Sequence, residues 1–306
     1  MEAMVSNAPI FLTGFARSGT TWVNRIMRDY FDVGFVNEGQ FIVTFGKRIS
    51  DYGDLGRAAN RSRLVRSLAG DPFFSILARN YKITMDWAAI EQASESFADV
   101  VRGVLRTIAV GMGKHRIGSK YPVFGHHLDL LNDLFPDCLV IHVIRDGRDC
   151  ALSHRGVTWG HQNTYSAAIH WRRYLETARH SARALGSRYF EIRYEDLLLD
   201  PEVAVGRLER FVTGEPDGQI AAKFLKDHPP LKTEKAGGWR MTMPARAQAI
   251  FESEAGDMLE SLGYPLTGDA HRLSPFSKLA YRAHDRLSRE GWYFARKMFK
   301  SIPERK

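Results

Sequence analysis

The hydrophobic pattern of the chain predicts short strands separated by amphipathic helices. Apolar residues fill the run Leu139 to Ile144 almost without interruption, as in a strand buried on both faces of a parallel sheet. After the first predicted strand, apolar residues follow helical spacing at Val23, Ile26 and Met27. The sequence therefore predicts an α/β fold, with a central parallel sheet of about five strands and helices on both faces. The predicted strands cover residues 10–13, 33–36, 117–119, 140–144 and 188–192.

Polar residues inside this predicted core are few. Cys138 and Cys150 lie in or beside a predicted core strand, so we expect buried thiols, with neither a disulfide framework nor a metal set. His142 is expected to be a hydrogen-bonded core histidine.

No N-terminal signal pattern is visible, and no apolar run approaches the roughly 18 residues that a membrane span needs. A cytoplasmic protein is therefore expected.

Charge is distributed unevenly along the 306 residues. The chain carries a net charge of +8, and residues 275–306 contribute +6 of it through nine Lys or Arg and three Asp or Glu. The basic character therefore belongs mainly to the C-terminal segment, and no nucleic-acid partner is expected. We predict a first domain over residues 1–266 and a basic amphipathic helical extension over residues 267–306.

The extension places its apolar residues on one helical face. Three interpretations stay open at this point: the helix packs back on the domain, it mediates self-association, or it lies on an anionic membrane surface. Gly291 is expected to bend or interrupt it. The apolar face consists of Phe276, Leu279, Ala280, Ala283, Leu287, Phe294, Met298 and Ile302.

A glycine-bounded loop between the first strand and the first helix is typical of an anion-binding site. Gly14 and Gly19 have the spacing of the Walker A pattern, and Thr21 occupies its Ser/Thr position. Thr20 stands in place of the lysine that reaches the β- and γ-phosphates, which argues against ATP or GTP. Arg17 supplies a cation within the loop instead. The layout favours the P-loop NTPase kind of three-layer fold, although an ordinary strand–turn–helix would show similar glycines.

The segment Gly-Phe-Ala-Arg-Ser-Gly-Thr-Thr-Trp resembles the 5′-phosphosulfate loop of sulfotransferases that use 3′-phosphoadenylyl sulfate (PAPS). Golgi-type and many bacterial members carry Arg-Ser-Gly-Thr-Thr, as this chain does. The resemblance spans about residues 8–265 and implies PAPS as co-substrate, with 3′,5′-adenosine bisphosphate (PAP) as product. It also implies that the donor's 5′ side is held by Arg17, Ser18, Gly19, Thr20, Thr21 and Trp22.

Three later segments resemble the rest of the donor site in such enzymes. An Arg at a strand end and a Ser eight residues later resemble the 3′-phosphate clamp, although the Arg could instead form an ion pair with Asp146 or Asp149. A Tyr-Glu-Asp-Leu segment implies a tyrosine near the adenine, and plain packing of that tyrosine is compatible with this role. A late glycine-containing loop implies closure over the nucleotide. The implied residues are Arg145, Ser153, Tyr194, Lys235, Gly238 and Trp239.

The resemblance also implies two catalytic residues. Lys120 matches the lysine that approaches the bridging oxygen between phosphate and sulfate, and Glu38 matches the glutamate base of Golgi tyrosylprotein-type members. From position alone, these residues could be a solvated lysine and a helix N-terminal charge. Pro122 stands where cytosolic members have their catalytic histidine, and His126 and His127 are reserve candidates for the base.

The expected activity is transfer of a sulfuryl group from PAPS to an acceptor hydroxyl or amine. The donor has no β- and γ-phosphates for Mg²⁺ to bridge, so no metal is expected. A small molecule, a glycan or a lipid could each be the acceptor. Two other classes remain open from the sequence: a P-loop small-molecule kinase, and a catalytically silent nucleotide-binding scaffold.

Overall fold

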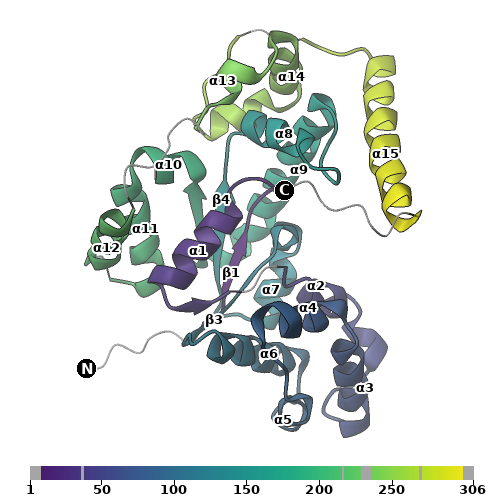
Figure 1. Ribbon diagram of the computed structural model, residues 1–306, viewed down its shortest axis with the longest axis vertical. Helices are drawn as coiled ribbons and strands as arrows, with labels where there is room; N and C mark the ends of the chain where they lie inside the picture. The colour runs from purple at the N-terminus through teal and green to yellow at the C-terminus, as the bar shows by residue number, and fades with distance from the viewer. Residues whose placement is uncertain (1–7, 36–37, 216, 229–235, 269–270, 299–306) are drawn as a thin grey trace.

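A five-stranded parallel β-sheet lies at the centre of the fold (Figure 1). The computed structural model describes residues 8–35, 38–215, 217–228, 236–268 and 271–298. The strand order is β2-β3-β1-β4-β5. This confirms the predicted α/β fold, and the last residue of the second predicted strand lies outside the described residues. The strands are β1 (Ile10–Thr13), β2 (Val33–Gly34), β3 (Arg116–Lys120), β4 (Leu139–Ile144) and β5 (Tyr189–Arg193).

The sheet separates two apolar cores because successive side chains of a strand point to opposite faces. Phe11 of β1 belongs to one core, whereas Ile10 and Leu12 belong to the other. All three side chains are fully buried. Strand β1 therefore lacks the alternation of polar and apolar residues that a half-exposed strand shows.

Helices cover both faces of the sheet. Val23 of α1 and Leu208 of α11 pack in the core that contains Ile10, while Val104 of α6 and Leu175 of α9 pack in the core that contains Phe11. The helices are α1 (Thr20–Tyr30), α2 (Phe41–Gly46), α3 (Ala58–Ala69), α4 (Pro72–Tyr81), α5 (Trp87–Gln92), α6 (Phe97–Gly111), α7 (Leu128–Leu134), α8 (Gly147–Arg155), α9 (Thr164–Ala182), α10 (Tyr194–Leu199), α11 (Pro201–Thr213), α12 (Gln219–Asp227), α13 (Trp239–Thr242), α14 (Ala245–Ser261) and α15 (Pro275–Met298). Short 3₁₀ helices are η1 (Ile49–Tyr52), η2 (Pro122–His126) and η3 (Arg183–Arg188).

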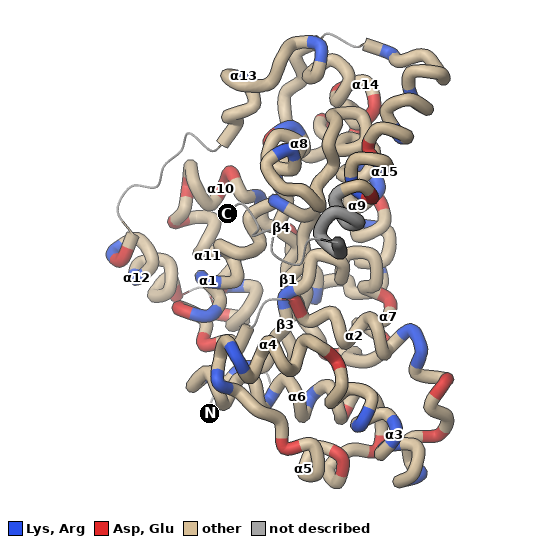
Figure 2. The backbone as a smooth tube through the Cα atoms, turned by 45° about the vertical axis from the view of Figure 1, so that its right-hand side comes forward, with Lys and Arg blue, Asp and Glu red and all other residues tan. Residues whose placement is uncertain are grey.

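The C-terminal helix α15 lies beside α9 at the edge of the molecule (Figures 1 and 2). It continues through Gly291, so the predicted interruption there is wrong. Among the described helices, none combines the length and the apolar character needed to cross a bilayer. The division of the chain at residue 266 stays a prediction.

The polar residues expected in the core are buried as predicted. Cys138 and Cys150 are free, buried thiols. The His142 side chain is fully buried, and its Nδ1 forms a hydrogen bond with the hydroxyl of Tyr189 on β5. Burial lowers the pKa of His142 from 6.5 to about 4. The folded protein therefore holds this imidazole in its neutral form at neutral pH.

We predict that His142 makes the fold sensitive to acid. Its folded-state pKa is depressed, so the unfolded chain binds a proton first as pH falls below 6.5, and the stability that the neutral imidazole contributes is lost toward pH 4. His142→Asn keeps a donor for Tyr189 and removes the titration. Between about pH 7 and pH 5, the variant should lose about 2 kcal/mol less unfolding free energy than the wild type, measured by urea titration. Equal losses would contradict this.

Candidate functional site

A cavity of about 470 Å³ opens at the carboxyl ends of β1, β3 and β4. The strand register explains its position, because Leu12 on β1 pairs with both Lys120 on β3 and Ile141 on β4. Residues that follow these strands therefore meet at one edge of the sheet, as is general for ligand sites in α/β proteins. The lining residues are Ala16, Arg17, Gly19, Thr20, Thr21, Trp22, Arg25, Glu38, Lys120, Pro122, Arg145, Ser153, Trp159 and Tyr194.

The loop between β1 and α1 requires glycine at both ends. Gly19 has φ +92°, and a Cβ atom placed on it would lie 2.3 Å from the Tyr194 ring. A Cβ atom on Gly14 would lie 2.6 Å from the carbonyl oxygen of Val143. Both glycines thus permit close approaches that any side chain would block.

The start of α1 is suited to an anion. No side chain caps this helix at Gly19. Since the first N–H groups of an α-helix have no intrahelical acceptor, they are available to a ligand in the cavity, and the helix dipole adds partial positive charge there. Within the chain, the Ser18 N–H donates to the Phe15 carbonyl (3.0 Å), and its buried hydroxyl contacts Cys150 Sγ (3.6 Å). The predicted contact of Ser18 with the donor stays a prediction.

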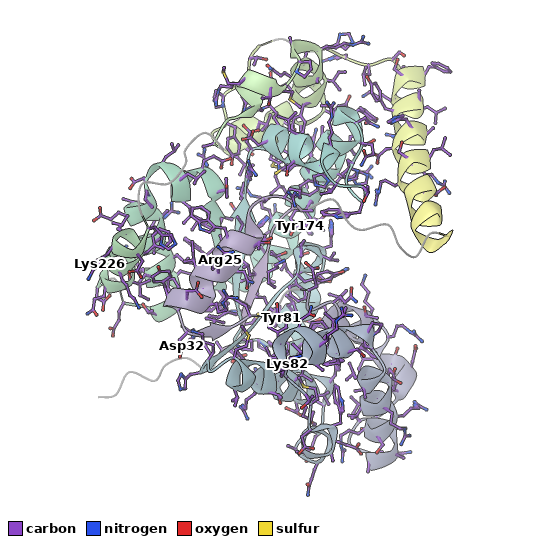
Figure 3. The ribbon with its side chains drawn as sticks, viewed as in Figure 1. Arg25, Asp32, Tyr81, Lys82, Tyr174 and Lys226 are labelled. Atoms are coloured by element: carbon purple, nitrogen blue, oxygen red, sulfur yellow. The ribbon has the colours of Figure 1, made fainter. Side chains whose placement is uncertain are left out.

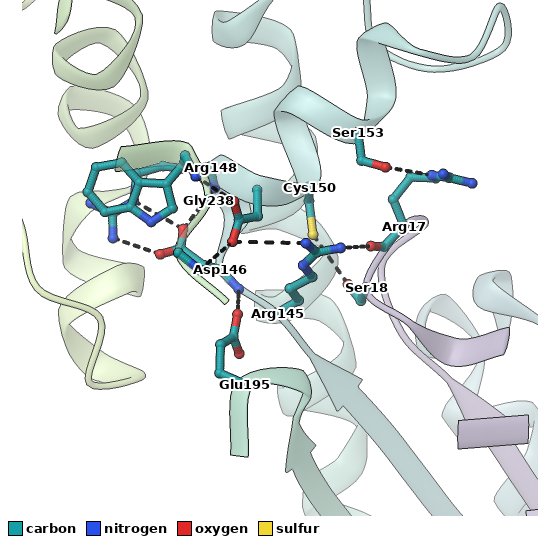
Figure 4. Close-up of polar contacts among 12 residues, drawn as sticks. Arg17, Ser18, Arg145, Asp146, Arg148, Cys150, Ser153, Glu195 and Gly238 are labelled. Atoms are coloured by element: carbon teal, nitrogen blue, oxygen red, sulfur yellow. Dashed lines mark hydrogen bonds and ion pairs between the residues drawn. The ribbon is translucent and has the colours of Figure 1, made fainter. Parts of the chain in front are cut away.

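Two of the predicted donor subsites are joined by direct hydrogen bonds (Figure 4). Arg17 Nε donates to Ser153 Oγ (2.8 Å), and Arg145 Nη1 donates to the Arg17 carbonyl (3.2 Å). The Arg145 guanidinium also lies over the Tyr194 ring, 4.5 Å from its centroid. The loop after β1 and the helix after β4 therefore place their polar groups on a common wall of the cavity.

The structure gives little support to the alternative in which Arg145 forms an ion pair with Asp146 or Asp149. Its guanidinium is 4.0 Å from the Asp149 carboxylate. Asp146, the other proposed partner, is instead bound by Arg148 at 2.8 Å. Asp149 accepts hydrogen bonds from the Trp239 N–H (2.8 Å) and from the N–H of residue 237 (3.0 Å). The acidic residues near Arg145 are thus occupied mainly by other groups.

A buried ionic network behind the cavity was not anticipated from the sequence. Arg148 is fully buried, donates to Glu252 (2.7 Å) and Asp146, and lies 3.6 Å from the centroid of a Trp239 ring. The Glu195 carboxylate accepts from the Asp146 N–H (2.9 Å). This network fixes the turn between β4 and α8 that carries Arg145. Its only sequence signal is the dense charge pattern Arg-Asp-Gly-Arg-Asp.

The described end of the late loop, from residue 236 onward, contacts this network. Trp239 is buried against Arg148, and neither Trp239 nor Gly238 is among the residues that line the cavity. Lys235 lies outside the described residues. The predicted nucleotide contacts of these three residues therefore stay predictions.

The two predicted catalytic side chains both line the cavity and contact each other. Lys120 is buried at the end of β3, and its Nζ lies 3.2 Å from Oε1 of the half-exposed Glu38. The Glu38 N–H donates to the Lys120 carbonyl (3.0 Å), which holds the residue at φ +68°. Gln40, not Glu38, is the N-cap of α2. The structure thus gives Glu38 a partner in the site, although Glu38 also lies two residues before the N-cap of α2.

The reserve histidines lie elsewhere. His126 packs against the ring of Tyr174, with a centroid separation of 4.9 Å, and neither His126 nor His127 lines the cavity. Burial lowers the pKa of both imidazoles, with help from the nearby charge of Lys47. The side chain of Tyr174 lies close to β1, where its hydroxyl contacts Thr13 Oγ1 at 2.7 Å (Figure 3).

Besides Ala16 and Pro122, two larger cavity residues, Arg25 and Trp159, were not predicted as part of the site. Arg25 lies on α1, one turn after Thr21, and adds a second exposed cation to the cavity (Figure 3). The spacing of four residues from Thr21 was the available signal. Trp159 lies in the segment between α8 and α9, and nothing in its sequence context indicated a place in the cavity.

Comparison with known proteins identifies the family. The profile of a family described as "Sulfotransferase family" matches residues 9–216. The chain belongs to the sulfotransferase family. A search of curated proteins found no match.

Solved structures show that this sulfotransferase shares its fold with other members. The sulfotransferase domain from the curacin biosynthetic pathway is 19% identical with a TM-score of 0.54, and the match covers 85% of this chain and 98% of that one. The sulfotransferase domain from the Synechococcus PCC 7002 olefin synthase is 22% identical with a TM-score of 0.50, and the match covers 85% and 95% of the two chains. The P-loop NTPase-like fold predicted from the glycine loop is thereby confirmed.

We predict that Gly19→Ala damages the sulfotransferase more than a matched glycine substitution elsewhere. Gly19 and Gly214 both have positive φ, +92° and +80°, but only at Gly19 does an added Cβ atom meet another group, the Tyr194 ring. Both alanines carry the left-handed backbone penalty of about 1–2 kcal/mol, and Gly19→Ala adds overpacking of about 1–3 kcal/mol. Urea unfolding should show the larger loss for Gly19→Ala. Equal losses would mean that Tyr194 moves aside freely.

Proposed function

We propose that this sulfotransferase uses PAPS as donor and transfers its sulfuryl group to an acceptor hydroxyl or amine. The observation that carries the proposal is a single cavity with two chemically distinct sides. Lys120 and Glu38 form one side, Arg145 and Ser153 form the other, and Arg17 in the loop before α1 lies between them, hydrogen-bonded to Ser153. PAPS has the matching layout, with a transferable group at its 5′ end and a second phosphate on its ribose.

The residues present fit this donor. The uncapped start of α1 and Arg17 would hold the 5′-phosphate, because backbone N–H groups and a helix dipole favour an anion at this point. Arg145 and Ser153 would hold the 3′-phosphate, since a guanidinium offers a planar fork of donors to phosphate oxygens. Tyr194 and Trp22, whose ring centroids are 5.6 Å apart, would border the adenine side.

Lys120 and Glu38 divide the chemistry between them. Glu38 takes the proton of the acceptor hydroxyl or amine as the new bond to sulfur forms. Lys120 stabilises the negative charge on the phosphate oxygen as its bond to sulfur breaks. Both side chains lie in one cavity, 3.2 Å apart. In-line transfer places the attacking and the leaving oxygen on opposite sides of the sulfur, so Glu38 would face the acceptor and Lys120 would face the leaving oxygen.

The proposal includes the absence of a metal requirement, because the donor lacks the β,γ-phosphate pair that Mg²⁺ bridges in kinases. Thr20 at the Walker lysine position points in the same direction. The acceptor could be a small molecule, a glycan or a lipid. Incubation with labelled PAPS and fractionated cell extract, followed by identification of the labelled product, would name it.

We predict that the protein binds PAP at least tenfold more tightly than AMP, because only PAP occupies the Arg145 side of the cavity. Arg145→Met should reduce this preference by about tenfold to a hundredfold, since a hydrogen bond to a charged group contributes about 1.5–3 kcal/mol. Isothermal titration calorimetry measures both affinities. Arg106→Met, an exposed arginine on α6, is the control and should leave the preference unchanged.

Equal binding of PAP and AMP by the wild type would overturn the donor assignment. Tighter binding of ATP–Mg²⁺ than of PAP would instead favour the kinase alternative that the sequence left open.

We predict that Glu38→Gln lowers kcat by about 10²- to 10⁴-fold, the range expected for loss of a general base. PAP affinity should stay within about threefold of wild type, because the base does not contact the donor's phosphates in this scheme. Lys120→Met should lower kcat as well. Glu202→Gln, on the exposed first turn of α11, is the matched control.

The measurement is sulfuryl transfer to the acceptor identified from extract. If Glu38→Gln and Lys120→Met both keep turnover within about threefold of wild type, the catalytic assignment is wrong. If the wild type binds PAP but modifies no acceptor, the scaffold alternative is favoured.

A further inference from the structure

Helix α15 packs against the domain through its polar side. Asp285 is buried, and its carboxylate accepts from the Gln162 N–H (2.7 Å) and contacts His161 Nδ1 (3.0 Å). Lys278 forms an ion pair with Glu254 on α14 (2.7 Å). The Tyr281 ring also packs near the Tyr165 ring of α9, with a centroid separation of 5.8 Å. These contacts hold the helix beside α9 without using Phe276, Leu279 or Leu287.

The apolar side of α15 faces solvent. Phe276, Leu279 and Leu287 are 80%, 64% and 68% exposed, and Ala280 and Ala283 between them are exposed too. A helix on a globular domain normally buries its apolar stripe and exposes its polar face. The helix thus packs back on the domain, as one interpretation expected, but in the opposite orientation. The apolar stripe is left without a partner among the described residues.

Arginines line one flank of the same helix. Arg282, Arg286 and Arg289 recur at spacings of four and three residues, so they share a side next to the apolar stripe. They border a second cavity, of about 530 Å³, between α15 and α9. Two carboxylates line it as well: Glu290 is paired with Arg286 at 2.7 Å, and Asp285 lies 3.9 Å from Arg289. Figure 2 shows basic positions along this helix.

We propose that α15 docks the protein on the surface of an anionic lipid bilayer. The exposed apolar stripe would lie at the boundary of headgroups and acyl chains, and the arginine flank would contact lipid phosphates. Charge complementarity favours this partner over a second copy of the chain, because a symmetric dimer through this face would bring two basic flanks together.

The docking face and the candidate active site adjoin one another. Trp159 lines both the cavity beside α15 and the cavity that contains Arg17 and Ser153. Docking would therefore bring the proposed catalytic cavity close to lipid headgroups. This inference concerns membrane binding and does not depend on the identity of the donor or of the acceptor.

Co-sedimentation of the full chain with vesicles tests the proposal. Vesicles of phosphatidylcholine with added phosphatidylglycerol should bind the protein at least tenfold more tightly than phosphatidylcholine alone, and high salt should weaken the binding. Leu279→Ser combined with Leu287→Ser should reduce binding at least tenfold. Val110→Ser on α6 is the matched control, because Val110 is 70% exposed far from α15, and it should leave binding unchanged.

Arg282→Gln combined with Arg286→Gln tests the electrostatic contribution to vesicle binding separately from the hydrophobic one. It should weaken binding to the anionic vesicles and leave any binding to phosphatidylcholine unchanged. The circular dichroism spectrum of each variant, compared with that of the wild type, checks that the domain is folded. The proposal is overturned if the wild type does not bind anionic vesicles, if the double serine variant binds as well as the wild type, or if the serines abolish only a dimer seen by analytical ultracentrifugation.

Discussion

The parallel pairing of β1 with β3 on one side and β4 on the other is the constraint on which the site depends. Leu12 pairs with Lys120 and with Ile141, so the carboxyl ends of the three parallel strands lie at one edge of the sheet. The residues that follow them, the glycine loop, Lys120 and Arg145, then share one cavity. A slip of one residue in β3 would move Lys120 to the other face of the sheet, since side chains alternate along a strand.

A network of buried charged residues holds the turn between β4 and α8, which carries Arg145, in place. Arg148, Asp146 and Glu252 form a network with almost no solvent contact, and the Trp239 ring lies against the guanidinium. Such networks contribute little net stability, but loss of one member leaves an uncompensated charge and costs about 3–5 kcal/mol. The network therefore acts mainly by fixing the turn that directs Arg145 into the cavity.

The C-terminal helix shows that hydrophobic periodicity predicts an amphipathic helix but not the face by which the helix packs. The sequence correctly indicated an amphipathic helix, with Phe276, Leu279 and Leu287 on one face. It could not indicate which face packs on the domain, because that choice depends on the polar partners that the segment before α9 offers to Asp285. Asp285 finds the His161 ring and the Gln162 N–H there, and this polar contact turns the apolar face to solvent.

The sequence by itself determined the strands, the glycine loop and the family, because buried strands and phosphate loops need particular residues at fixed local spacing. It also nominated Glu38 and Lys120, which lie 3.2 Å apart although 82 positions separate them. Only the tertiary structure decided that Arg25 and Trp159 line the cavity, that Trp239 is buried against Arg148, and that α15 packs by its polar side. These outcomes depend on contacts between distant segments, which leave no local pattern in the chain.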